Sequence, residues 1–270
     1  MTAETTRLIE EIERKAFRAL HAAADGKTRV ALGLEWHEVG GVSVSIARHE
    51  PSILLNRAIG LGIEGPATRD TVEAVVARYR EAGVGRYFFH LHPEAEPLEL
   101  AGWMGAAGLE RGRGWMKFLR LTEPMAPARS DLSCREIGAE DAAAFGRIAT
   151  ANFGMSEKAA PLVASLHGQP GWHLFMSFDG EVPAGTAALY LDDGIGWCDW
   201  SATDPAFRRR GSQSALLAAR VAKAIELGAK LISTETGKEV PGDPQHSYHN
   251  IVKAGFREAV VRENWVPQVQ

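Results

Sequence analysis

One segment in the second half of the 270-residue chain constrains the fold more than any other. Residues 195–203 are rich in β-forming and aromatic residues and predict a strand, which Asp204 and Pro205 end because proline cannot donate to a ladder. The arginines at 208–210 and Gly211 follow, and behind them apolar residues recur at the helical period. Leu217, Val221, Ala224, Ile225 and Gly228 fall on one face of this helix, and Arg220, Lys223 and Glu226 on the other. The segment therefore predicts a strand, a basic turn and an amphipathic helix.

The basic turn predicts a seat for a small phosphate ligand. The first N–H groups of a helix have no partner within the helix and carry partial positive charge, so they attract anions. Gly211 lets the backbone approach such an anion without steric conflict. A Walker loop is excluded, because His21 stands where the first glycine would precede Gly26-Lys27-Thr28.

The order Arg208-x-x-Gly211-x-Gln213, after a strand and before a long helix, resembles the acyl-CoA pyrophosphate loop of the GNAT superfamily of N-acyltransferases. The usual loop has a small residue where this chain has Gln213. The order downstream is similar to that superfamily too, with a strand at 230–234, a helix at 246–253, a Gly-Phe step and a last strand at 257–265. The resemblance covers residues 134–266 and implies an α/β fold, in which helices flank a mixed central sheet.

The first half of the chain predicts the same order of elements. A helix around residues 72–79 stops at Gly83, a strand follows at 86–89, and a second helix ends at Gly108. Gly83 and Gly108 are 25 residues apart, and Gly228 and Gly255 are 27 apart, so the halves are interpreted as diverged copies. The alternative is a coincidence between two ordinary α/β units. The stretch 61–68 has Glu64 and no arginine, which predicts one working cofactor site, in the second half.

These observations predict two tandem GNAT-like domains. Residues 1–122 form a degenerate copy, residues 123–133, with two prolines and no apolar periodicity, form a linker, and residues 134–270 form the acyl-CoA-binding domain. The first copy begins with a helix whose packing face is expected to hold six apolar residues, namely Leu8, Ile12, Ala16, Ala19, Leu20 and Ala23.

The resemblance implies acetyl-CoA as co-substrate and indicates the residues that meet it. The main chain at the end of the strand would pair with the pantetheine arm and the thioester carbonyl, and the loop and helix start would bind the pyrophosphate. The implied cofactor-binding residues are Ser201, Ala202, Thr203, Arg208, Arg209, Arg210, Gly211, Ser212, Gln213, Ser214 and Asn250.

Transfer to an amine needs a base more than an acid. An alkylamine with a pKa of about 10.4 is almost fully protonated at pH 7, a deficit of about 4 to 5 kcal/mol, whereas a thiolate with a pKa of about 8.5 needs about 2 kcal/mol of help to leave. Asp199 and Glu235 are the candidate bases, with a structural hydrogen bond as the alternative role. Many members of the superfamily have a tyrosine acid where this chain has Ile251, so Tyr248, one turn earlier, is the candidate acid, or else a packing residue.

The leading hypothesis is an acetyl-CoA-dependent N-acetyltransferase that acts on a small-molecule primary amine by direct attack in a ternary complex. The alternative is a non-catalytic acyl-CoA-binding or interaction protein. A net charge of −4 and a single short basic cluster argue against nucleic acid as a partner, and two distant cysteines indicate neither a disulfide nor a metal site. Without a long apolar run, no membrane partner is expected and the location is predicted to be cytoplasmic, as a monomer or homodimer.

Overall fold

The computed structural model describes residues 2–126, 128–242 and 246–268. In the first part of the chain, up to residue 122 and here called the N-terminal half, the elements alternate between helices and short strands. They are α1 (Ala3–Ala23), α2 (Gly26–Leu32), β1 (Leu34–Val39), β2 (Val42–Ala47), β3 (Arg57–Ile59), α3 (Arg69–Glu81), β4 (Phe88–Leu91), α4 (Leu100–Ala106), β5 (Leu109–Arg111) and β6 (Trp115–Arg120).

The C-terminal half, from residue 133 onward, repeats this alternation with longer strands. Its main elements are β7 (Ser133–Glu136), α5 (Ala142–Asn152), α6 (Ala160–Ala164), β8 (Trp172–Asp179), β9 (Val182–Asp192), β10 (Ile195–Thr203), α7 (Ser212–Glu226), β11 (Leu231–Gly237), α8 (His246–Lys253) and β12 (Arg257–Pro267). The mixed α/β class predicted from the sequence is confirmed, and the strand at 195–203 and the helix at 246–253 have the predicted bounds.

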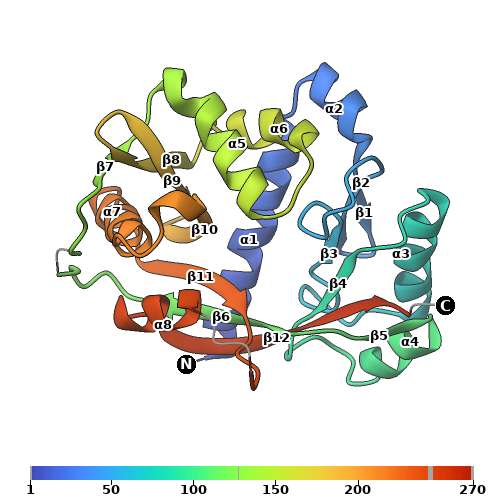
Figure 1. Cartoon of the computed structure of the whole chain (residues 1–270). Helices are drawn as coiled ribbons and strands as arrows, with labels where there is room; N and C mark the ends of the chain where they lie inside the picture. Colours follow the sequence, from blue (N-terminus) through green and yellow to red (C-terminus); the bar gives the residue numbers. More distant parts are fainter. Residues whose placement is uncertain (1, 127, 243–245, 269–270) are drawn as a thin grey trace.

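The strands of the two halves form one mixed sheet. Its order is β1-β2-β3-β4-β12-β6-β11-β10-β9-β8-β7, with β5 paired to β12 beside this path. Strand β6 of the N-terminal half lies between β11 and β12, and the end of β12 lies between β4 and β5. Figure 1 shows β12 and the β5–β6 segment side by side along the base of the molecule. Each half therefore completes its part of the sheet with a strand from the other.

Helix α1 lies between the two halves and packs against both (Figure 1). Ile12, Ala16 and Leu20 of the predicted packing face are buried in a core that also contains residues of α5, β8 and β10. Leu8, however, is 41% exposed, while Ile9 and Glu13 are fully buried, so the prediction for Leu8 was wrong. The helix is enclosed on more sides than an amphipathic surface helix, because sheet elements of both halves contact it.

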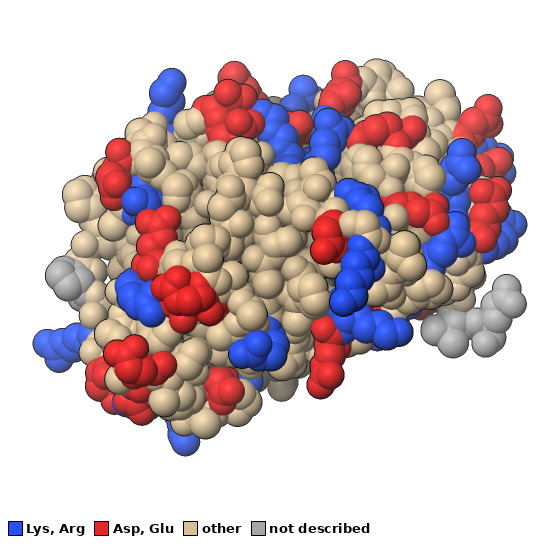
Figure 2. Space-filling view, turned by 90° about the horizontal axis from the view of Figure 1, so that it is seen from above, with Lys and Arg blue, Asp and Glu red and all other residues tan. Residues whose placement is uncertain are grey.

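The surface seen from above carries basic and acidic side chains intermingled, with no continuous basic track (Figure 2). A polyanion such as nucleic acid would find no extended counter-charge on this face. Among the residues that the structure describes, no helix is long and apolar enough to cross a membrane.

Candidate active site

The turn before α7 has the geometry of an anion seat. Gly211 is the N-cap residue, with a left-handed backbone at φ 82°, and the first backbone bond onto the helix runs from the Ala215 N–H to the Gly211 carbonyl at 3.0 Å. The amides of residues 211–214 precede that bond. They are therefore the orphan donors of a helix N-terminus, which an anionic ligand can satisfy.

Buried hydroxyl groups fix the start of α7 to the sheet. Ser212 is only 2% exposed, and its Oγ lies 2.8 Å from Oγ of Ser177 in β8 and 3.3 Å from Oγ1 of Thr203 in β10. These contacts join the helix tip to two strands, so the direction of its amides is set by the sheet.

The three arginines of the turn have different surroundings. Arg208 donates from Nε to the Thr203 carbonyl at 3.3 Å and from Nη2 to Asn152 at 3.2 Å. Arg210 is bound to Asp131 and Asp179, with N–O distances of 2.8 Å to each, and its hydrogen bonds lower the pKa of both carboxyl groups. Arg209 also has a left-handed backbone, and among the described residues its guanidinium, unlike those of Arg208 and Arg210, forms no hydrogen bond or ion pair.

A cavity of about 1050 Å³ opens beside this turn, between the end of β10, the start of α7 and helix α8. It is slightly larger than many small-ligand pockets, which suits an extended ligand. Ten of the eleven predicted cofactor residues line it, and Arg210 is the exception because its side chain is held by Asp131 and Asp179. The ten are Ser201, Ala202, Thr203, Arg208, Arg209, Gly211, Ser212, Gln213, Ser214 and Asn250.

Gln213 occupies the position where the GNAT loop usually has a small residue. Its Oε1 accepts a hydrogen bond from Nδ2 of Asn250 at 2.7 Å. The side chain thus links the start of α7 to α8 across the cavity wall, and this bond fixes where the amide of Gln213 points.

Strand β10 is distorted where it meets the cavity. Its parallel ladder with β11 ends at Cys198 and Thr234, and its register with β9 shifts between Asp199 and Ala202, at a bulge where Trp200 has φ 51°. Beyond this point residues 201–203 line the cavity and have no pairing with β11. A strand that leaves its neighbour offers main-chain groups to a ligand.

Arg220 of α7 binds main-chain carbonyls next to this bulge, a contact that the sequence did not predict. It was expected on the polar face of the helix, but it is only 2% exposed and donates to the carbonyls of Ala188 at 3.3 Å and Asp199 at 3.2 Å. Asp199 and Ala188 form the last β10–β9 pair before the register shift, so the guanidinium satisfies oxygens at the edge of the bulge. A helical period alone cannot distinguish such a buried arginine from a solvated one.

Tyr248 lines the cavity from α8, and its hydroxyl donates to the carboxylate of Glu258. Its ring contacts Phe118 edge to face at a centroid distance of 4.9 Å. Partial burial and the bond to Glu258 raise the pKa of Tyr248 to about 12, so the phenol is protonated at neutral pH. Ile251, at the usual tyrosine position, is 5% exposed and packs into the core.

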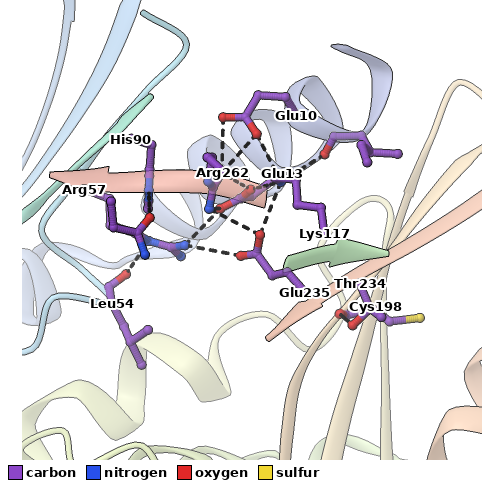
Figure 3. Close-up of polar contacts among 12 residues, drawn as sticks. Glu10, Glu13, Leu54, Arg57, His90, Lys117, Cys198, Thr234, Glu235 and Arg262 are labelled. Atoms are coloured by element: carbon purple, nitrogen blue, oxygen red, sulfur yellow. Dashed lines mark hydrogen bonds and ion pairs between the residues drawn. The ribbon is translucent and has the colours of Figure 1, made fainter. Parts of the chain in front are cut away.

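The two candidate bases lie on adjacent strands just beyond the last β10–β11 pair. Asp199 is half-buried, and burial raises its pKa. Glu235 contacts Lys117 and Arg262 at 3.2 Å each, and burial together with the nearby Glu13 raises its pKa to about 7 (Figure 3). Neither carboxylate lines the cavity, so each would reach a substrate there through water or after a shift of side chains.

The corresponding turn of the N-terminal half differs. The N-terminus of α3 is capped by its own Thr68, whose Oγ1 accepts from the Thr71 N–H at 3.1 Å, and Glu64 forms an ion pair with Arg14. A Cβ on Gly62 would lie 2.5 Å from the Glu96 carbonyl, which shows how closely this turn packs against its neighbour. One amide at the start of α3 is therefore already bound by a protein group, and the turn before it carries an acidic side chain in place of arginines.

No group of three or more His, Cys, Asp or Glu residues in the described parts of the chain is placed to hold a metal ion. His90 and His92, the closest histidine pair in the sequence, are both buried, and His90 bonds Asn264 at 2.7 Å.

Comparisons with known proteins agree with this geometry. Residues 143–249 match the model of the acetyltransferase (GNAT) family. Among solved structures, the chain is similar to a GCN5-related N-acetyltransferase from Kribbella flavida, with 18% identity over 90% of this chain and 96% of that one and a TM-score of 0.61. A tandem GNAT protein from the clavulanic acid biosynthesis pathway is 14% identical over 84% of this chain and 78% of that one, with a TM-score of 0.56. No curated protein matches the sequence.

A functionally unknown conserved protein from Staphylococcus epidermidis is also similar, with 8% identity over 92% of this chain and all of that one and a TM-score of 0.56. At such identities a structural match establishes the fold alone. Residues 143–249 therefore match a GNAT acetyltransferase domain, and the chain as a whole has a GNAT-like fold.

Proposed function

We propose that this protein transfers the acetyl group of acetyl-CoA to a small-molecule primary amine, by direct attack in a ternary complex. One observation carries the proposal: the free amides at the start of α7 open onto a cavity of about 1050 Å³ that residues 201–203 of a splayed strand also line. A diphosphate fits the amides, and an extended thioester arm fits the exposed main chain.

A carboxylate near the end of the β10–β11 ladder would take the proton from the amine. Because the rate depends on the unprotonated amine, a base that is half ionised near neutral pH is matched to the task. Glu235, with a pKa of about 7, fits this requirement better than Asp199, which bonds to its neighbouring backbone. Water would carry the proton from the cavity to either group.

Tyr248 fits a hydrogen-bonding role better than that of an obligatory acid. A phenol with a pKa of about 12 would give its proton to a thiolate with a pKa of about 8.5 at a cost of about 5 kcal/mol. The thiolate needs less than that to leave unprotonated at pH 7, about 2 kcal/mol. To stabilise the leaving sulfur, the phenol would instead donate a hydrogen bond to it, which requires its O–H to turn away from Glu258.

Calorimetric titration with acetyl-CoA, followed by turnover assays with a broad panel of primary amines, tests the proposal. The expected result is micromolar binding and amine-dependent release of free CoA thiol, with intersecting initial-rate lines when both substrates are varied. Tight binding without transfer to any amine between pH 6 and 9 would favour a non-catalytic acyl-CoA-binding protein. No binding at all would reject the site.

A further inference from the structure

Six charged side chains are buried together where the two halves meet (Figure 3). Their side chains are at most 8% exposed, and they come from five different elements. They are Glu10 and Glu13 of α1, Arg57 of β3, Lys117 of β6, Glu235 of β11 and Arg262 of β12.

Two of the three cations that contact Glu235 belong to the N-terminal half. The Lys117 Nζ lies 3.2 Å from Oε2 of Glu235, and the Arg57 Nη1 lies 3.8 Å from Oε1. Arg262, at 3.2 Å, is the third and belongs to the C-terminal half. Lys117 is directly opposite Glu235 in the ladder, because β6 has been inserted between β11 and β12.

The cations are shared unequally among the acidic groups. Glu13 is in contact with Lys117, Arg57 and Arg262, and despite its burial these charges hold its pKa well below the usual range. Glu235 has the longer contacts and also faces Glu13, so its proton is held far more tightly. Buried ion pairs are a costly way to join two halves, since apolar residues of similar volume would do so at least as well. The cluster is therefore better explained by its effect on the position and the charge of the Glu235 carboxylate.

Charged groups act on Glu235 from four elements packed around it. They are Glu13 of α1, Arg57 of β3, Lys117 of β6 and Arg262 of β12. Three further titratable groups interact with members of this cluster, namely Glu10 of α1, His90 of β4 and Asp199 of β10. Glu235 is also the first residue of β11 beyond the last pair with β10.

We propose that Lys117 and Arg57 are positioning residues that hold the carboxylate of Glu235 in place and favour its charged form. The half without a cofactor loop would thus complete the active site of the other half. This inference rests on the proposed function, with Glu235 as the base.

The test is the pH dependence of kcat in K117M and R57M, together with a carbon NMR titration of glutamate-labelled protein. Loss of a cation leaves the carboxylate less stabilised, so the acidic limb of the kcat profile should move to higher pH by about 1 to 3 units, more for K117M than for the more distant Arg57. The carboxyl resonance that titrates near pH 7 should move by the same amount and be absent from E235Q. K117R keeps the charge and should stay close to wild type.

Lys15→Met is the matched control, because Lys15 of α1 also joins the halves, through ion pairs with Asp192 and Asp193, but does not contact Glu235. It should leave both the profile and the resonance unchanged. A lower kcat with an unmoved limb in K117M and R57M would overturn the proposal, as would an E235Q variant with wild-type kcat. If K117M does not fold, R57M decides. If the wild type acetylates no amine, the proposed function fails, while the NMR titration still tests the electrostatic coupling alone.

Discussion

Replacement of Gly211 by alanine tests how the turn before α7 is held. Gly211 has φ 82°, and a Cβ at this position would lie 2.2 Å from the Arg129 carbonyl oxygen and 3.0 Å from the Ser130 Cα. Both contacts are with backbone of the segment that joins the halves, so relief requires that segment to move. Ser130 also donates to the Arg210 carbonyl at 2.9 Å, and this bond would be strained by the same movement.

Gly228 provides the matched control. It has φ 80° at the other end of the same helix, with no atom within 4 Å of a built Cβ. G228A should therefore cost only the left-handed strain of an alanine, about 1 to 2 kcal/mol. G211A should cost that amount plus about 1 to 3 kcal/mol for overpacking and the weakened hydrogen bond, so about 2 to 5 kcal/mol in total.

Equilibrium urea unfolding of the two variants and the wild type measures these values, and calorimetry measures acetyl-CoA affinity. G211A should bind at least about tenfold more weakly, because the amides of the turn shift with it, whereas G228A should bind normally. Equal destabilisation of the two variants would refute the role assigned to the Arg129 contact. Normal affinity in a folded G211A would refute the placement of the diphosphate at this turn.

Three further predictions concern single side chains. Y248F should lower kcat by less than about tenfold, since its phenol is a poor proton donor to a thiolate, and a hundredfold loss at constant KM would contradict this. R209A should weaken acetyl-CoA binding by about tenfold or more and reduce its salt dependence, whereas R210A should do neither, because its guanidinium is held by two aspartates. Burial lowers the pKa of His21 to about 3, below its unfolded value of 6.5, so the unfolded state takes up the proton first as the pH falls. His21 should thus lower the free energy of unfolding by up to about 1.4 kcal/mol for each pH unit below 6.5. Unfolding curves of H21Q between pH 7 and 4 should lack this contribution.

Local features of the sequence predicted much of the fold. The strand at 195–203, the helix that follows Gly211 and the helix at 246–253 were all predictable, because turn residues and apolar periods bound them on both sides. Ten of the residues that line the cavity were predicted for the same reason, since all but Asn250 lie between residues 201 and 214. The lining residues Asn152 and Thr186, from distant segments, were not predicted.

Features that depend on contacts between distant segments were not predictable. Nothing in residues 115–120 indicates that this strand pairs with β11 and β12 rather than with its own half. Glu10 and Glu13 follow the pattern of a solvated helix face, yet they are buried because their cationic partners come from three strands, β3, β6 and β12. The positions of such charges depend on long-range strand pairing, which a single sequence does not reveal.

The exchange of strands also determines what the chain could become if it were divided. A cut in the segment between the halves would leave one fragment without the strand that fills the slot between β4 and β5, and the other without the strand between β11 and β12. Each fragment would expose unpaired sheet edges and would regain its missing partner only by docking with the other. The chain could therefore be divided into a split protein, whose activity would report that the two fragments have associated.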